Sequence, residues 1–178
     1  EPLRRAAAAE ALGRLGGEAA TSALRPCLQD TDPGVRLAVA AALGQIADPT
    51  SGADLTPLLA DGDPDVRRAV ARALGRLGNP AAAAPLAEAL IQPDQPVLVR
   101  RALAAALVHV PHPHAQPALL AALADPDPQV RGYAARALGH VGNEAAHAPL
   151  EALRADRSRL IRGTVGDRAA RAVALLER

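Results

Sequence analysis

Residues 61–78 read Asp-Gly-Asp-Pro-Asp-Val-Arg-Arg-Ala-Val-Ala-Arg-Ala-Leu-Gly-Arg-Leu-Gly. The apolar residues of this stretch recur every three or four positions, which places them on one face of an α-helix. The residues that share this spacing are Val66, Val70, Ala73, Leu74 and Leu77. Asp63-Pro64 comes just before them, and aspartate can cap a helix whose first turn holds a proline. The stretch therefore predicts one amphipathic helix with a defined start.

The same pattern recurs along the whole chain, each copy carrying an arginine in the matching position. These arginines are Arg5, Arg36, Arg67, Arg100, Arg131 and Arg162, and the steps between them are 31, 31, 33, 31 and 31 residues. A fixed period of this length is typical of repeat proteins in which each unit packs on its neighbours.

A second helix is expected after the first in every repeat. Its markers are Leu24, Leu55, Leu86, Leu119 and Leu150. Pro26 and Pro57 fall late in the first two of these helices, so we expect both helices to be shortened or kinked. The first helices are expected to end at glycines with positive φ, namely Gly16, Gly78 and Gly142.

We therefore predict an all-α fold, a right-handed α-solenoid of stacked antiparallel helix pairs. Residues 1–178 are expected to form a single solenoid of about five helix pairs plus a C-terminal helix that runs from Ile161 through Val165 to Leu176. The expected units are approximately 1–30, 31–61, 62–94, 95–125, 126–156 and 157–178.

Composition excludes several function classes. The formal net charge is +1, so we expect neither nucleic acid nor an anionic membrane as a partner. The single cysteine, Cys27, rules out an internal disulfide framework and a cysteine-rich zinc site. No apolar run approaches the roughly 18 residues of a membrane span. The chain begins at Glu1, and we expect a cytoplasmic monomer or a part of a longer repeat array.

The pattern Asp-x-Asp-Pro-x-Val-Arg, then Ala-x-x-Ala-Leu-Gly, then a Pro-Leu helix, resembles the HEAT repeat family over essentially the whole chain. It is most similar to the short bacterial variety named after phycobilin lyases. The resemblance implies that ladders of aspartate and arginine link neighbouring repeats. The ladder positions are Asp30, Arg36, Asp61, Arg67, Asp94, Arg100, Asp125 and Arg131. The arginine row could also be read as phosphate-binding, but the equally periodic aspartates favour structural pairing. Val108 departs from the pattern, which has glycine there.

In the HEAT family, outward positions of the second helices line the inner face, which makes them candidates for binding a partner. The candidate residues are Arg25, Thr56, Ala87, Glu88, Gln116, Leu120, His147 and Glu151. This row is mixed in character and mildly apolar at its centre. It therefore suits a peptide or protein better than nucleic acid, which calls for arginine rows and stacking aromatic residues.

Histidines gather near the fourth repeat, at His109, His112, His114 and His140. Imidazoles are common zinc ligands, but the spacing matches no known ligand motif, and a solvated, proline-rich turn is the favoured interpretation. Cys27 lies beside two leucines of a second helix, where a packed thiol is commoner than a nucleophile. We predict no catalytic residue and no cofactor.

The favoured function is a non-enzymatic protein-interaction scaffold. The alternatives are an enzyme or accessory protein of the phycobilin-lyase-like class, and a metal-binding module that uses the histidines. Residues 154–178 contain seven arginines, so a basic end that docks an acidic partner is a further possibility. Irregular steps and an arginine-rich, lysine-free composition indicate a natural bacterial sequence of high GC content rather than a designed array.

Overall fold

The computed structural model describes residues 1–177, which form helices and connections apart from an isolated bridge between Arg159 and Thr164. Five helices open the helix pairs: α1 (Pro2–Leu15), α3 (Pro33–Ile46), α5 (Pro64–Leu77), α7 (Val97–His109) and α9 (Pro128–Val141). Their partners are α2 (Gly17–Leu24), α4 (Gly52–Leu55), α6 (Ala83–Leu90), α8 (Gln116–Ala122) and α10 (Glu144–Leu153). A last helix, α11 (Val165–Leu176), follows.

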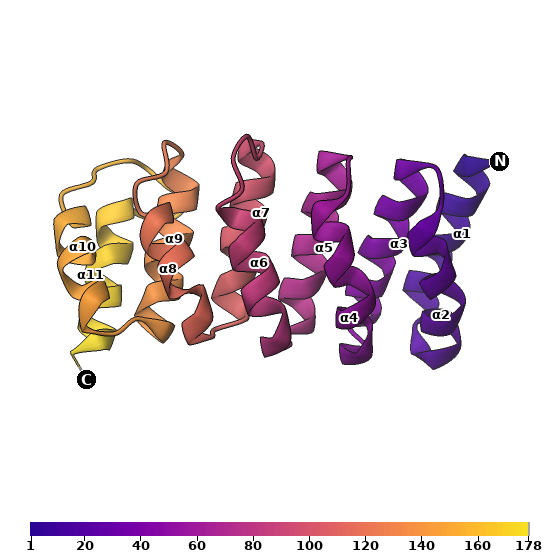
Figure 1. Cartoon of the computed structure of the whole chain (residues 1–178), viewed down its shortest axis with the longest axis horizontal. Helices are drawn as coiled ribbons and strands as arrows, with labels where there is room; N and C mark the ends of the chain where they lie inside the picture. The colour runs from indigo at the N-terminus through magenta and orange to yellow at the C-terminus, as the bar shows by residue number, and fades with distance from the viewer. Residues whose placement is uncertain (178) are drawn as a thin grey trace.

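Figure 1 shows the pairs standing side by side in chain order, from the N-terminus at one end to the C-terminus at the other. The predicted all-helical solenoid is therefore confirmed. We call α1, α3, α5, α7, α9 and α11 the A helices and the others the B helices. Among the described helices, none has both the length and the apolar character needed to cross a membrane.

Proline shapes the B helices, as the sequence predicts. The first two B helices change to 3₁₀ geometry where Pro26 and Pro57 occur, in η1 (Arg25–Gln29) and η3 (Thr56–Ala60). Proline has no N–H to donate into the helix and its ring crowds the preceding turn. Three shorter 3₁₀ turns that begin with proline precede later B helices: η2 (Pro49–Ser51), η4 (Pro80–Ala82) and η5 (Pro113–Ala115). As a result, α4 is only four residues long.

The starts of the A helices are as predicted, and one of the expected ends is not. Asp63 caps α5 by accepting hydrogen bonds from the backbone N–H groups of residues 65 and 66. Gly16 and Gly78 have the expected positive φ of 72° and 64°. Gly142 has φ −67°, so the expectation of a left-handed end was wrong there. Its N–H instead donates to the Leu138 carbonyl at 2.7 Å and ends α9 without a left-handed residue.

Small residues let neighbouring A helices touch. A Cβ atom added at Gly44 of α3 would lie 2.8 Å from both Cα and Cβ of Ala73 in α5, closer than two carbon atoms can pack. The same pairing of glycine with alanine recurs along the array: Gly13 with Ala42, Gly75 with Ala106, and Gly139 with Ala172. Leucines from both layers are fully buried beneath these contacts, among them Leu43, Leu55, Leu74, Leu86, Leu119, Leu138 and Leu150.

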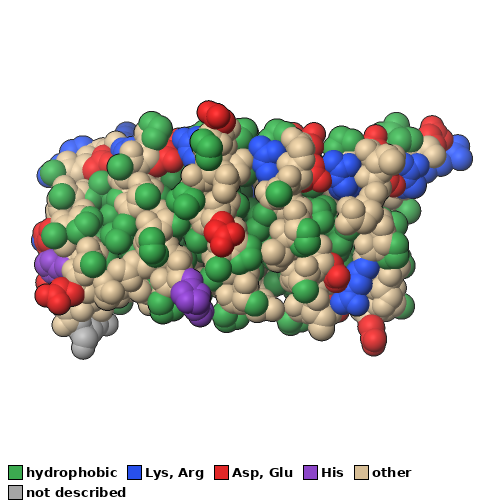
Figure 2. All heavy atoms as spheres, viewed as in Figure 1, with side chains coloured by type: hydrophobic (Ala, Val, Ile, Leu, Met, Phe, Trp, Pro, Cys, Tyr) green, Lys and Arg blue, Asp and Glu red, His purple; other side chains and the backbone are tan. Residues whose placement is uncertain are grey.

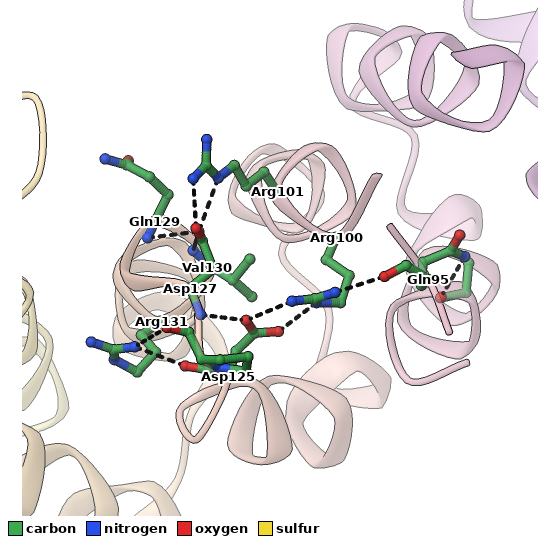
Figure 3. A network of polar contacts seen from close by, with 10 residues as sticks. Gln95, Arg100, Arg101, Asp125, Asp127, Gln129, Val130 and Arg131 are labelled. Atoms are coloured by element: carbon green, nitrogen blue, oxygen red, sulfur yellow. Dashed lines mark hydrogen bonds and ion pairs between the residues drawn. The ribbon is translucent and has the colours of Figure 1, made fainter. Parts of the chain in front are cut away.

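Arginine–aspartate pairs join each repeat to the next. Arg36 donates from Nε and Nη2 to the two carboxylate oxygens of Asp61, at 2.7 and 2.8 Å, and from Nη1 to the Asp30 carbonyl at 2.8 Å. These bonds raise the pKa of Arg36 and lower that of Asp61. Four of the repeat arginines pair with the aspartate 25 residues later: Arg5 with Asp30, Arg36 with Asp61, Arg100 with Asp125, and Arg131 with Asp156. Figure 3 shows the Arg100–Asp125 pair, and Figure 2 shows charged side chains gathered along one long edge.

Arg67 departs from this ladder, and the expected role of Asp94 was wrong. Arg67 Nε donates to Gln95 Oε1 at 3.0 Å. Gln95 is buried, and its carbonyl accepts from Arg100 Nη1 at 2.6 Å, the contact seen at the right of Figure 3. Asp94 is exposed with φ 59°. The longer connection before α7 turns through this left-handed residue, so the following residue takes the ladder position.

The start of the last helix also differs from expectation. Ile161 is 88% exposed and lies ahead of α11, whose first residue is Val165. Ala172 meets Gly139 as Ala106 meets Gly75, so Val165 takes the place expected for Ile161. Arg162 accordingly lies outside the arginine ladder. Four residues are close to the 3.6 of one helical turn, so the apolar stripe fits either register.

Candidate functional site

The B helices and their 3₁₀ turns carry the residues expected to bind a partner. Arg25 lies in η1 and Thr56 in η3, while α6, α8 and α10 each carry two of the remaining six. The structure thus distributes the eight candidates over all five second helices, one layer of the solenoid.

Several candidate side chains are engaged in bonds within the protein. Arg25 Nη2 donates to Thr50 Oγ1 at 2.6 Å, and Arg25 Nε lies 2.9 Å from Asp54 Oδ2. Gln116 Nε2 donates to Asn143 Oδ1 at 2.6 Å. These bonds join successive repeats through the B layer, so Arg25 and Gln116 stabilise the stack.

Three other candidates also make polar contacts within the protein. The Thr56 hydroxyl donates to the Gly52 carbonyl at 2.8 Å, within its own turn of helix. Glu151 pairs with Arg154 three residues on, at 3.0 Å. His147 Nε2 lies 3.4 Å from Glu177 Oε1, which links α10 to the residue after α11.

The apolar centre of the expected row belongs mainly to the core. Ala87 is 5% exposed and packs in the buried cluster, so its expected place on the binding surface was wrong. Leu120 is half-buried against the same cluster. Glu88 is exposed and makes no ion pair with any described residue. Among the charged candidates, Glu88 is therefore the one left unpaired within residues 1–177.

A hollow of about 660 Å³ lies beside Glu88, between η3, α6 and the connection to α7. Thr56 and Glu88 line it together with Pro57, Pro85, Gln92 and Asp94. The proline-induced 3₁₀ turn forms one wall and the longer connection forms another. The repeat pattern placed Asp94 in the ladder and not at this hollow. The extra residues in that connection were the available signal.

A second hollow, of about 560 Å³, lies between α10 and α11. It is lined by His147 and by Asn143 and Glu144 at the start of α10, with Leu176 from α11. The two hollows lie toward opposite halves of the array, so a partner that filled both would have to extend along the B layer.

The four histidines are not brought together. The rings of His112 and His114 are adjacent, with centroids 4.7 Å apart, and His112 Nδ1 accepts from the His114 backbone N–H. His109 lies in a groove between α5 and α7, whereas His140 lines a pocket between α9 and α11. Within residues 1–177, no group of three or more histidine, cysteine, aspartate or glutamate side chains is placed to hold a metal ion.

Comparison with known proteins identifies relatives of the fold. The sequence profile described as HEAT repeats matches residues 1–62, 28–98 and 89–167. An engineered protein is similar with TM-score 0.75 and 22% identity, covering 99% of this chain and 93% of its own. A designed armadillo repeat protein in complex with the peptide (KR)4 has TM-score 0.74 and 18% identity, covering 96% and 91%.

A natural protein is also similar. The complex of CpcE and CpcF of phycocyanin lyase from Nostoc sp. PCC7120 has TM-score 0.53 and 29% identity, covering 99% of this chain and 74% of its own. Among curated proteins, none matches this chain.

Proposed function

We propose that this chain, which belongs to the HEAT repeat family, is a non-enzymatic scaffold that binds a peptide segment of a partner protein on its B-helix layer. The HEAT and armadillo-like fold supports a role in protein interaction at the level of the fold. We propose further that residues 1–178 act as a single solenoid, so that the partner meets one continuous stack.

The observation that carries the proposal is the hollow of about 660 Å³ beside Glu88. Its volume lies within the range of about 300–1,000 Å³ that is usual for ligand sites. Prolines and alanines supply apolar walls, which favour side chains over a bare ion. Its lining includes neither histidine nor cysteine.

The charge of this hollow indicates the partner. Glu88 and Asp94 are exposed and make no ion pair with any described residue, whereas Asp61, which also lines the hollow, is already bound by Arg36. Arg67 lines the hollow as well, and its guanidinium already donates to the Gln95 side chain and to the backbone carbonyls of residues 61 and 62. The left-handed backbone at Asp94 lets its short side chain lie at the rim. Two carboxylates beside apolar walls suit a segment that carries lysine or arginine next to an apolar residue. The armadillo protein described above binds a lysine- and arginine-containing peptide.

The competing proposal is a role in handling a tetrapyrrole, supported by the 29% identity to the CpcE–CpcF complex. Apart from histidines, the chain has one aromatic ring, that of Tyr133, with which to stack on such a ligand. Absorbance spectra recorded as a bilin is added to the purified protein would show a shifted band if this proposal is correct.

Fluorescence anisotropy with labelled peptides tests the scaffold proposal. The probes are a peptide of alternating arginine and leucine and the same peptide with glutamate in place of arginine. We expect the basic peptide alone to bind. The double variant Glu88→Gln, Asp94→Asn should weaken it about tenfold, because it removes two charge-assisted contacts while asparagine tolerates the backbone at position 94.

Glu10→Gln is the matched control, since Glu10 is an exposed carboxylate on α1 at the far end of the array. It should leave the affinity unchanged within about twofold, the range expected of screened surface charge. Equal binding of both peptides, or equal weakening by the two sets of substitutions, contradicts the proposed site.

A further inference from the structure

A pocket of about 580 Å³ lies in the A-helix layer, between α9 and α11. Arginines surround it: Arg136 comes from α9, Arg168 and Arg171 come from α11, and Arg162 comes from the connection before α11. Ala172 and Leu175 supply an apolar wall, and Leu175 is 41% exposed. None of the partner-binding candidates lines this pocket, so the inference does not depend on the function proposed above.

The pocket arginines are unlike the ladder arginines. Every ladder arginine is hydrogen-bonded to an aspartate or a glutamine, but the four pocket arginines make no ion pair within 4.0 Å among residues 1–177. One carboxylate, that of Asp167, lines the pocket. It is already engaged, because its Oδ2 accepts from the Thr164 backbone N–H at 2.7 Å in the capping box of α11. The pocket is therefore strongly and locally positive.

Arg168 shows most clearly that the positive charge of this pocket is not neutralised. Its Nη1 atom is buried and has no hydrogen-bond partner among the described residues. Its guanidinium lies over the ring of Tyr133, 5.3 Å from the ring centroid. Burial lowers the pKa of Arg168, and the positive charges of Arg136 and Arg171 lower it further. A guanidinium held in a partly buried place adds its positive charge to the wall of the pocket that Arg168 lines, and this charge favours an anion there.

A departure from the repeat builds the pocket. The connection before α11 is one helical turn longer than the spacing of the repeats predicts, and it carries Arg162 and Gly163 to the pocket rim. Gly163 has φ 75°, and a Cβ there would lie 2.8 Å from Asp167 Oδ2, so this turn requires glycine. The matching groove between α5 and α7 is smaller, about 420 Å³, and has Arg72, Arg76 and His109 without such a connection.

We propose that the pocket between α9 and α11 binds a small organic phosphate, with its phosphate group among the arginines and its apolar body against Ala172 and Leu175. Four arginines and one engaged carboxylate line the pocket, and this excess of positive charge favours a doubly charged group over a single carboxylate. Guanidinium geometry suits phosphate because two N–H groups can donate to two oxygens in parallel. The apolar wall favours an organic ester over the free ion.

Isothermal titration calorimetry with phenyl phosphate tests this assignment, in a phosphate-free buffer of fixed ionic strength. Inorganic phosphate and phenol are the comparison probes. Phenyl phosphate should bind at least about tenfold more tightly than inorganic phosphate, because the ring buries apolar surface, and phenol should not bind measurably. Arg171→Gln should weaken phenyl phosphate about tenfold by removing one charge-assisted contact.

Arg72→Gln is the matched control, because Arg72 occupies in α5 the position that Arg171 occupies in α11. It should change the affinity by less than about twofold, as expected for a distant surface charge. Circular dichroism verifies that the variants fold, and Arg162→Gln, outside any helix, replaces Arg171→Gln if that variant does not fold.

Three results would overturn the proposal: no heat from phenyl phosphate, equal affinity for phenyl and inorganic phosphate, or equal weakening by Arg72→Gln and Arg171→Gln. The proposal would also be overturned by an oligonucleotide that binds more tightly than phenyl phosphate and whose binding is weakened by both Arg72→Gln and Arg171→Gln. Such binding would indicate an extended surface rather than a pocket.

Discussion

Replacing Arg36 by alanine tests whether the ladder stabilises the stack. The substitution removes two hydrogen bonds to the Asp61 carboxylate and two to backbone carbonyls, at 2.7–3.2 Å. It leaves Asp61 with the N–H of Asp63 as its remaining partner, at 2.9 Å. The side-chain hydrogen bonds that are lost therefore all belong to the Asp61 carboxylate, which is almost fully buried.

The burial of the Arg36–Asp61 pair decides how far the substitution lowers the free energy of unfolding. The Arg36 side chain is 18% exposed and that of Asp61 is 8% exposed. Exposed ion pairs contribute about 0–1 kcal/mol, and removal of one partner of a fully buried pair costs about 3–5 kcal/mol. The Arg36–Asp61 pair lies between these limits, so we expect Arg36→Ala to lower the free energy of unfolding by about 2 kcal/mol.

Urea denaturation provides the measurement, with two probes. Circular dichroism at 222 nm follows all the helices, and the fluorescence of Tyr133, the sole tyrosine, follows α9. In a cooperative stack the two transitions coincide, and Arg36→Ala shifts both to lower urea. The control is Arg5→Ala, which removes the same kind of pair at the end of the array, where the arginine side chain is 42% exposed.

The double variant Arg36→Ala, Asp61→Ala completes a mutant cycle. The pair should show a coupling energy of at least about 1 kcal/mol, the scale of neighbouring residues in one network. Coupling near zero, or a loss from Arg36→Ala no greater than that from Arg5→Ala, would refute the claim that the ladder holds the repeats together.

Gly44→Ala should destabilise the stack by about 1 kcal/mol, because crowding against Ala73 costs more than the gain in helix propensity; urea midpoints measure this. Stability should fall as the pH is lowered from about 4 to about 2, measured by thermal denaturation across that range. Arginine hydrogen bonds lower the pKa of Asp61 and bring that of Asp30 to about 2, so their contribution is complete above the unfolded pKa and is lost on protonation. Thr164→Ala should cost about 1 kcal/mol locally by removing the cap of α11, measured by amide hydrogen exchange.

Each of these three predictions has a result that would contradict it. Ala41→Gly, on the exposed side of the same helix, isolates the propensity effect, so a stabilised Gly44→Ala protein would mean that the helices can move apart. A melting temperature constant between pH 4 and pH 2 would contradict the role of the aspartates. Uniformly faster exchange along the whole chain in Thr164→Ala would show that α11 does not unfold on its own.

The period of the arginines was sufficient to predict the helix pairs, because a stack of equal units places equivalent residues at equivalent positions. It could not predict which carboxylate each arginine meets. Asp94 and Gln95 differ by one residue, and a left-handed turn in the connection selects Gln95. The step of 33 residues marks the longer connection, but a step length does not say which residue of the connection takes the left-handed conformation.

The candidate site was predicted less well than the fold. Outward positions were assigned from helical spacing, but Arg25 and Gln116 meet partners in the next repeat, and Ala87 is covered by neighbouring helices. Both facts depend on the distance between repeats, which one repeat's sequence does not contain. The pocket between α9 and α11 was missed because Ile161 and Val165 fit the same apolar stripe.

The one-turn offset before α11 bears on how such arrays diverge. Extra residues in the connection ahead of a helix are taken up by that connection, so the apolar side of the helix still faces inward, as it does after the two extra residues before α7 and the four before α11. Such length changes can therefore persist in a lineage with little damage to folding. Each one adds a new loop beside an intact framework, so a lengthened connection is where this solenoid can gain new chemistry while the rest of the stack stays constant.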